Sequence, residues 1–138
     1  MSALAHVLAS RIEIRNSVFL GRVNFINSIF REPLDLSGST FRQEASFSSA
    51  TFLAMVSFAS AHFQEDALFD GTAFMKTADC SAASFQREIT FAGASINKMR
   101  LSSAQISGQL SLQNAEFNRL EARWPVLCNH LRYDGETY

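Results

Sequence analysis

Apolar residues recur along most of this chain at steps of five and six residues, a rhythm that neither an α-helix nor an alternating strand produces. Between Ala45 and Phe69 every step falls on a phenylalanine. Continued in both directions, the same register contains all 13 phenylalanines of the protein, and its other members are aliphatic residues and one cysteine. These central positions are Ile14, Phe19, Phe25, Phe30, Leu36, Phe41, Phe47, Phe52, Phe58, Phe63, Phe69, Phe74, Cys80, Phe85, Phe91, Ile96, Leu101, Ile106, Leu112 and Phe117.

The residue two places before each central position forms a second column, which contains no charged residue. Residues two apart on an extended chain lie on the same face, so each unit reads as a very short strand with two inward side chains. The residue between them then points outward, and most of these residues are small and polar. The second column is Ile12, Ser17, Val23, Ser28, Leu34, Ser39, Ala45, Ala50, Val56, Ala61, Ala67, Thr72, Ala78, Ala83, Ile89, Ala94, Met99, Ala104, Leu110 and Ala115.

Two or three residues separate one unit from the next, and these residues form the predicted corners. The short corners, such as Ser48-Ser49 and Asp70-Gly71, hold small residues, Gly and Asn, which suit tight turns. Short strands with regular corners favour a chain that winds into stacked coils, which is a parallel β-solenoid. A sandwich of conventional strands is the alternative, but its strands would be about 5–6 residues long with turns of varied length.

The repeated units NSIF, GSTF, SSATF, ASAHF and AGASI resemble the motif of the pentapeptide repeat proteins, and the 11-residue alternation resembles their Phe-rich subfamily. The resemblance covers about Ile12 to Phe117. It implies an all-β fold: a right-handed quadrilateral parallel β-helix of about five coils. One departure is expected at Leu101 and Ile106, where successive five-residue steps leave a coil one residue short.

Four-sided winding would sort the longer corners onto two opposite edges. One edge carries mostly charged corners, from Leu20-Gly21-Arg22 to Gln86-Arg87-Glu88. The other edge places Leu53, Met55 and Met75 on adjacent coils, and an apolar patch of that kind is a candidate partner-binding edge. The alternative is that these three residues are scattered surface apolar side chains.

The repeat ends near Phe117, and a different spacing follows it. Leu120, Trp124, Leu127 and Leu131 follow a 4, 3, 4 spacing, which predicts an α-helical cap over residues 119–133 with Trp124 as its anchor. The predicted organisation is therefore an N-terminal cap at 1–11, the β-helix at 12–117 and a helical C-terminal cap at 118–138. The tail also resembles the segment that follows the repeats in longer pentapeptide proteins, so the chain could continue into a further segment.

Candidate chemistry is sparse in this sequence. His6, His62 and His130 have no carboxylate or cysteine at ligand spacing, so no metal site and no cofactor are expected. No nucleophile or phosphate-binding motif is present, which predicts a non-enzyme. Two cysteines outside any CxxC, no apolar run of 18 residues and no secretory signal pattern predict a cytoplasmic protein without a membrane segment.

Two functions remain open at this point. The first is a structural or protein-interaction module, a rigid rod that binds a protein partner or serves as a domain of a larger protein. The second follows from the resemblance, because some pentapeptide repeat proteins mimic duplex DNA and bind DNA gyrase. Against mimicry stand a formal net charge of −1 and basic residues interleaved with acidic ones. Direct nucleic-acid binding is not expected, and a homodimer through an end cap stays open.

Overall fold

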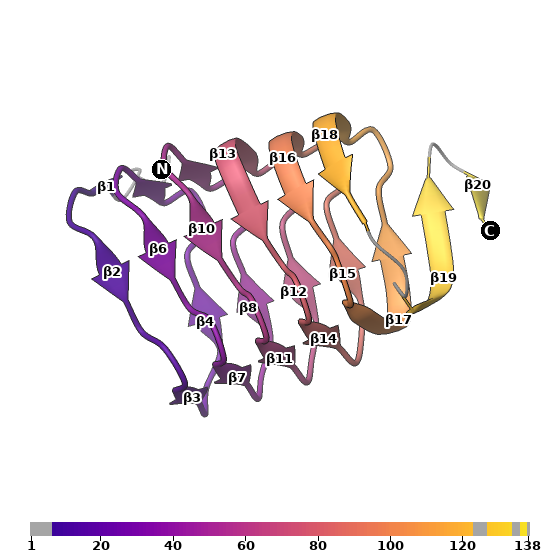
Figure 1. Cartoon of the computed structure of the whole chain (residues 1–138), viewed down its shortest axis with the longest axis horizontal. Helices are drawn as coiled ribbons and strands as arrows, with labels where there is room; N and C mark the ends of the chain where they lie inside the picture. Colours follow the sequence, from indigo (N-terminus) through magenta and orange to yellow (C-terminus); the bar gives the residue numbers. More distant parts are fainter. Residues whose placement is uncertain (1–6, 123–126, 134–135, 138) are drawn as a thin grey trace, which may run out of the picture.

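The computed structural model describes residues 7–122, 127–133 and 136–137. Over these residues the chain is all-β and winds into a rod of about five stacked turns, with its strands running across the rod (Figure 1). The strands are β1 (Val7–Leu8), β2 (Ile12–Glu13), β3 (Val18–Phe19), β4 (Val23–Asn24), β5 (Ile29–Phe30), β6 (Leu34–Asp35), β7 (Thr40–Phe41), β8 (Ala45–Ser46), β9 (Thr51–Phe52), β10 (Val56–Ser57), β11 (His62–Phe63), β12 (Ala67–Leu68), β13 (Ala73–Asp79), β14 (Ser84–Phe85), β15 (Ile89–Thr90), β16 (Ser95–Arg100), β17 (Gln105–Ser111), β18 (Glu116–Glu121), β19 (Leu127–Tyr133) and β20 (Glu136–Thr137).

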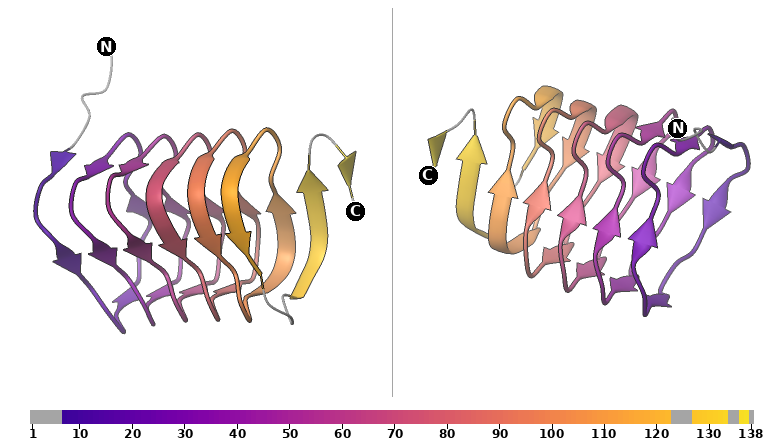
Figure 2. Two further views of the ribbon diagram at one scale, coloured as in Figure 1. Left: turned by 45° about the horizontal axis from the view of Figure 1, so that its top comes forward. Right: turned by 180° about the vertical axis from the view of Figure 1, so that it is seen from behind.

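Away from the two ends of the rod, each strand pairs in parallel with the strand one coil before it and the strand one coil after it. Val56, for example, lies opposite Leu34 on one side and Ala78 on the other, so one coil takes 22 residues. The pairs form four columns, which we call faces A to D (Figure 2). Face A comprises β1, β5, β9 and the first halves of β13, β16 and β18, and face B comprises β2, β6, β10 and the second halves of those strands. Face C comprises β3, β7, β11, β14 and the first halves of β17 and β19, and face D comprises β4, β8, β12, β15 and the second halves of those strands.

The two predicted inward columns form the core. Phenylalanines from Phe30 to Phe91 are almost fully buried, and so are the small residues of the second column, such as Ala45 and Ala61. Rings on one face stack directly from coil to coil, as Phe30, Phe52 and Phe74 do on face A, with centroids 4.8 and 5.1 Å apart. The coil spacing of about 4.8 Å falls within the range at which offset aromatic rings attract each other, so backbone pairing and ring stacking reinforce each other.

The two-residue corners are tight turns, as predicted. In most of them the carbonyl of the central residue before the corner accepts a hydrogen bond from the amide three residues later, as Phe47 does from Ala50 at 3.0 Å. At Arg15-Asn16 the amide of Ser17 donates instead to the hydroxyl oxygen of Ser39. The second corner residue has positive φ, a conformation that Gly and Asn adopt at low cost. The residues in this conformation are Asn16, Asn27, Gly38, Ser49, Ser60, Gly71, Ala82, Gly93, Ser103 and Asn114.

The predicted short coil is confirmed. Phe74 pairs with Ile96, but Thr77 pairs with Lys98, so the register shifts by one residue between Phe74 and Thr77. Asn97 and Lys98 therefore form a two-residue corner where the preceding coil has Met75, Lys76 and Thr77. The missing residue is absorbed at an exposed corner, and the inward columns stay aligned on both sides of it.

The predicted helical cap is wrong, because the described residues of this region form strands. Leu120 lies in β18 opposite Met99, and β19 pairs in parallel with β17, with Leu127 opposite Gln105 and Leu131 opposite Leu110. Trp124, the expected anchor, lies outside the described residues. The spacing misled because Leu127 and Leu131, which are four apart as in a helix, lie opposite Gln105 and Leu110, on either side of the corner within β17.

The solenoid also extends beyond both ends of the predicted repeat. At the N-terminal end, Val7 and Leu8 pair with Ile29 and Phe30, so coil structure begins before Ile12. At the other end, β20 folds back on β19 as an antiparallel partner.

Candidate interaction edge

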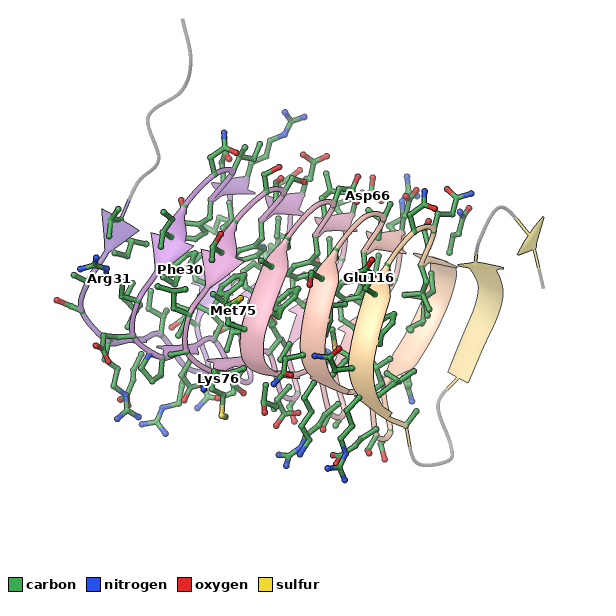
Figure 3. The ribbon with its side chains drawn as sticks, turned by 90° about the horizontal axis from the view of Figure 1, so that it is seen from above. Phe30, Arg31, Asp66, Met75, Lys76 and Glu116 are labelled. Carbon is green, nitrogen blue, oxygen red and sulfur yellow. The ribbon has the colours of Figure 1, made fainter. Side chains whose placement is uncertain are left out.

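The three-residue corners lie on two opposite edges of the rod, as the winding predicts. The AB edge joins faces A and B, and the CD edge joins faces C and D; Figure 3 shows Lys76 of the first and Asp66 of the second on opposite sides. The AB edge comprises residues 9–11, 31–33, 53–55, 75–77, 97–98 and 118–119. The CD edge comprises residues 20–22, 42–44, 64–66, 86–88 and 107–109.

The predicted apolar patch lies on the AB edge. Leu53 is 41% exposed, Met55 44% and Met75 53%, and they occupy consecutive corners about one coil spacing apart. Their backbone is held in place, since the amide of Leu53 donates to the carbonyl of Phe30 and the amide of Leu34 donates to the carbonyl of Met55. The structure thus places the three exposed residues on two successive corners, and backbone hydrogen bonds hold the first of these corners to the neighbouring coil.

A hollow of about 280 Å³ adjoins this patch on its face B side. Arg11, Pro33, Leu34, Asp35, Met55 and Ser57 line it. Pro33 and Met55 contribute apolar side chains to this lining, and Arg11 and Asp35 contribute one cation and one anion.

The AB edge is also basic. Its charged residues are the cations Arg11, Arg31, Lys76, Lys98 and Arg119 and the single anion Glu32. The CD edge instead holds Arg22, Arg42, Glu44, Glu65, Asp66, Arg87 and Glu88. Within the described part of the chain, Arg31 and Lys76 form no ion pair with an acidic side chain, whereas Arg87 of the CD edge pairs with Glu65 at 3.6 Å.

At the C-terminal end of the AB edge, several cations gather around one carboxylate. Glu121 contacts the Lys98 ammonium at 3.3 Å, Arg119 at 3.3 Å and Arg100 at 3.1 Å. The pKa of Glu121 is lowered, and the largest cause is the hydrogen bond from Lys98. Partial desolvation raises this pKa, but the hydrogen bond from Arg100 and the positive charges of Lys98 and Arg100 lower it further. Three cations share one anion, so this cluster is positive as a whole.

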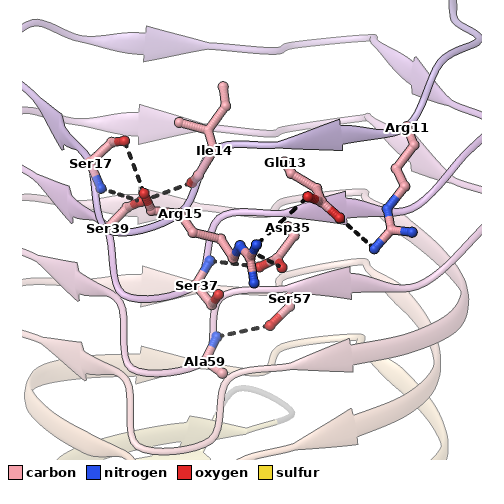
Figure 4. Close-up of polar contacts among 10 residues, drawn as sticks. All are labelled: Arg11, Glu13, Ile14, Arg15, Ser17, Asp35, Ser37, Ser39, Ser57 and Ala59. Atoms are coloured by element: carbon pink, nitrogen blue, oxygen red, sulfur yellow. Dashed lines mark hydrogen bonds and ion pairs between the residues drawn. The ribbon is translucent and has the colours of Figure 1, made fainter.

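The acidic residues of face B, which had suggested a negative surface, serve the fold. Asp35 accepts a hydrogen bond from the backbone amide of Ser37 at 3.0 Å, and Asp79 accepts one from Ser81 at 2.9 Å (Figure 4 shows the first). Arg15 lies 3.8 Å from both Asp35 and Glu13, and Arg11 also pairs with Glu13. Asp35 and Asp79 thus support tight turns, and Glu13 and Asp35 are paired with cations along the same face.

The same turn support recurs where the outward residue is neutral, a role that sequence reasoning missed. Asn24 accepts from the amide of Ile26, Ser57 from Ala59 and Thr90 from Ala92. The signal was present in the sequence, because Asn, Asp, Ser or Thr stands two places before the first corner residue and can bond its amide in an Asx or ST turn.

Few other groups could take part in chemistry. His62 Nδ1 lies 2.7 Å from the Ser84 hydroxyl on the exposed face C. Cys80 is a free, fully buried thiol, and burial, with the Asp79 charge second, raises its pKa to about 12, so it is not a nucleophile in the folded state. His6 lies outside the described residues, as does the His130 side chain. Across residues 7–122 no group of three or more His, Cys, Asp or Glu is arranged to hold a metal ion, and no helix in the described regions is long and apolar enough to cross a membrane.

Sequence reasoning also missed the exposed apolar residues of the first coil. Val7, Ile14, Val18 and Leu20 are exposed, and Phe19 and Phe25 are only partly buried. Ile14, Phe19 and Phe25 occupy the positions of Leu36, Phe41 and Phe47, which are fully buried one coil later, whereas Val7, Val18 and Leu20 match positions that are not buried there. No described strand pairs on the outer side of β1 to β4, so this end lacks the covering coil that buries the same positions elsewhere.

Four strands per coil, ladders of stacked rings and turns at fixed intervals define the class of this protein as a parallel β-solenoid built from short repeats. Residues 36–84 match the family model described as pentapeptide repeats (9 copies), so this part of the chain is similar to the proteins of that family. Neither a curated protein nor a solved structure matches the chain.

Proposed function

We propose that this protein is a non-catalytic interaction module that binds a protein partner through the AB edge, either alone or as a domain of a larger protein. The observation that carries the proposal is the exposure of Leu53, Met55 and Met75 on consecutive corners. Exposed apolar side chains that lie together, rather than singly, are typical of surfaces that bind other proteins. The buried thiol of Cys80 suits a reducing compartment, so we include a cytoplasmic location in the proposal.

The solenoid gives such an edge two useful properties. Its core is dense with stacked rings, so the corners are held at fixed spacing and a partner does not have to order them on binding. Its coils also repeat at about 4.8 Å, which produces a long, regular contact surface. Both properties favour recognition of an extended or helical segment over recognition of a small molecule.

Mimicry of DNA is the weaker alternative. A mimic needs a continuous negative surface, but Asp35 and Asp79 on face B support backbone turns, and Arg15 neutralises Glu13 and Asp35. Arg100 and Lys98 extend the positive charge over the same side of the rod.

Site-specific photocrosslinking in cells that produce the protein tests the proposal. p-Benzoylphenylalanine is placed at position 53 on the AB edge and, as a matched control, at the exposed position 86 on the CD edge. We expect a discrete protein adduct from position 53 that is absent from position 86 and is lost when Met75→Glu is added. Equal labelling from both edges, or none from position 53, would contradict a partner-binding role for the AB edge.

A further inference from the structure

The order of side chains along the AB edge has a simple pattern. Arg11 and Arg31 stand on the first two corners, Leu53, Met55 and Met75 on the next two, and Lys98 and Arg119 on the last two. Lys76 shares a corner with Met75. The edge is thus basic at both ends, and its two middle corners carry the three apolar side chains together with the cation Lys76.

The dimensions of the edge match an α-helix laid lengthwise. Six corners span about 24 Å, which a helix of about 16 residues covers at 1.5 Å per residue. The helix pitch of about 5.4 Å is close to the coil spacing of about 4.8 Å, so one helical turn meets about one corner. Same-side residues of an extended peptide lie about 6.7 Å apart and would lose register within two or three coils.

The hollow beside Met55 adds a third feature. Pro33 and Met55 in its lining offer an apolar surface for one side chain of a partner, and Arg11 lines the same hollow. A hollow with defined lining residues favours a protein segment over a lipid surface, which would meet the charges and the three apolar side chains without needing a recess.

We propose that the partner segment is an amphipathic α-helix that is acidic at both ends and apolar in its middle, and that it lies along the AB edge with one apolar side chain in the hollow beside Met55. The inference rests on the proposed function, since it names the chemistry of the partner for the same edge. Acidic residues of the helix would face Arg31 and Lys76, which have no acidic partner among the described residues, and would share the cluster around Glu121.

A designed 18-residue helix tests the inference with the full-length chain. The probe carries Glu at both ends and Leu and Phe on one face of its middle, and its binding is measured by fluorescence anisotropy. Two control peptides are compared with the probe. One has Lys in place of Glu, and the other has two central prolines that prevent helix formation. We expect the acidic helix to bind, the Lys version not to bind and the Pro version to bind at least about tenfold more weakly.

Charge reversal on the protein supplies the matched variants. Arg31→Glu with Lys76→Glu on the AB edge should weaken binding at least about tenfold, whereas Arg22→Glu with Arg42→Glu on the CD edge should change it less than about twofold. Met55→Gln with Met75→Gln should weaken binding while leaving its salt dependence unchanged. All six positions are exposed, and unchanged thermal unfolding checks that each variant folds.

Several outcomes would overturn the inference. Equal binding of the Lys version, or equal loss on both edges, would exclude the acidic chemistry, and full binding of the Pro version would exclude the helix. If the protein sediments with phosphatidylserine vesicles but does not bind the peptide, the ligand of the AB edge is a membrane surface and not a helix. Crosslinking from position 53 together with failure of the acidic helix would refute the inference alone, whereas absence of crosslinking refutes the proposed function.

Discussion

The rings of Phe41 and Phe63 lie nearly parallel, with their centroids 4.5 Å apart and 3° between their planes. Phe63 stacks in the same way on Phe85, at 4.9 Å and 8°. Each ring inside the ladder therefore contacts one ring above and one below, and both contacts repeat the backbone pairing of β7, β11 and β14. Stability in such a solenoid is a sum over neighbouring coils, so a defect in one coil weakens the two interfaces it shares.

Replacing Phe63 by Ala should lower the free energy of unfolding by about 3–5 kcal/mol, because a buried ring is lost and a cavity remains between Phe41 and Phe85. The exposed neighbour Gln64 provides the control, since Gln64→Ala should change stability by less than about 0.5 kcal/mol. Chemical denaturation of both variants measures the difference. Similar effects at the two positions would show that the inward register is misassigned.

Ala82→Gly should increase the free energy of unfolding by about 0.5–1 kcal/mol. Ala82 has a φ of 58°, where a Cβ is unfavourable, and glycine removes that strain. Part of the gain is offset because glycine makes the unfolded chain more flexible and so loses more conformational entropy on folding. The control is Ala59→Gly at the first position of an equivalent corner, which lacks positive φ and should lose about 0.5–1 kcal/mol. Thermal unfolding of the two variants should therefore shift in opposite directions.

The sequence predicts the coils well because each one repeats the same physical choice. The inward residues, such as Ala61 and Phe63, and the Gly or Asn residues of the tight corners recur at the same positions in successive coils. An error at one position therefore does not change the predicted fold. It fails at Leu120 to Leu131, where no phenylalanine marks the repeat and spacings of three and four fit a helix as well as a short corner. There, the edge of β17 offers free backbone hydrogen-bonding groups, and β19 pairs with them as a strand. The local spacing of apolar residues carries no information about that edge.

The candidate edge likewise has features that the sequence predicts and features that it does not. The sequence places Leu53, Met55 and Met75 on adjacent corners, because the winding fixes their positions. It does not reveal the hollow beside Met55, whose walls come from three successive coils and depend on how Arg11 and Pro33 lie against each other. Nor does it show that Asp35 is engaged by Arg15, which is a property of neighbouring coils rather than of local spacing.

Cys80 should remain unreactive in the folded protein and make stability fall at high pH. Burial raises its pKa to about 12, so the native state keeps the proton while the unfolded chain releases it above about pH 8.5. The contribution is fully present below that pH and is lost as the pH rises toward 12. In a Cys128→Ser background, we expect unfolding free energy to fall by about 1–2 kcal/mol between pH 8 and pH 10.

The matched control for that titration is Cys80→Ala in the same background, which should abolish this part of the pH dependence although it lowers stability overall. Labelling with a thiol reagent at pH 8 provides an independent measurement. Complete reaction is expected in denaturant and almost none in buffer. Rapid labelling of the native protein would contradict the burial of Cys80 between Phe58 and Leu101.

Glu121 should titrate below the ordinary range of a glutamate, because Lys98 and Arg100 stabilise its charged form. Its interactions favour the folded state above the unfolded pKa, and the contribution is lost as the pH falls through the lowered folded value. Lys98→Met removes the largest cause and should move the pKa of Glu121 upward, as followed by carboxyl ¹³C chemical shifts. Lys76→Met, on the same edge one coil earlier and without a contact to Glu121, should leave it unchanged. An unchanged titration in Lys98→Met would mean that Arg100 and Arg119 alone hold the carboxylate, and that Lys98 is free to face a partner.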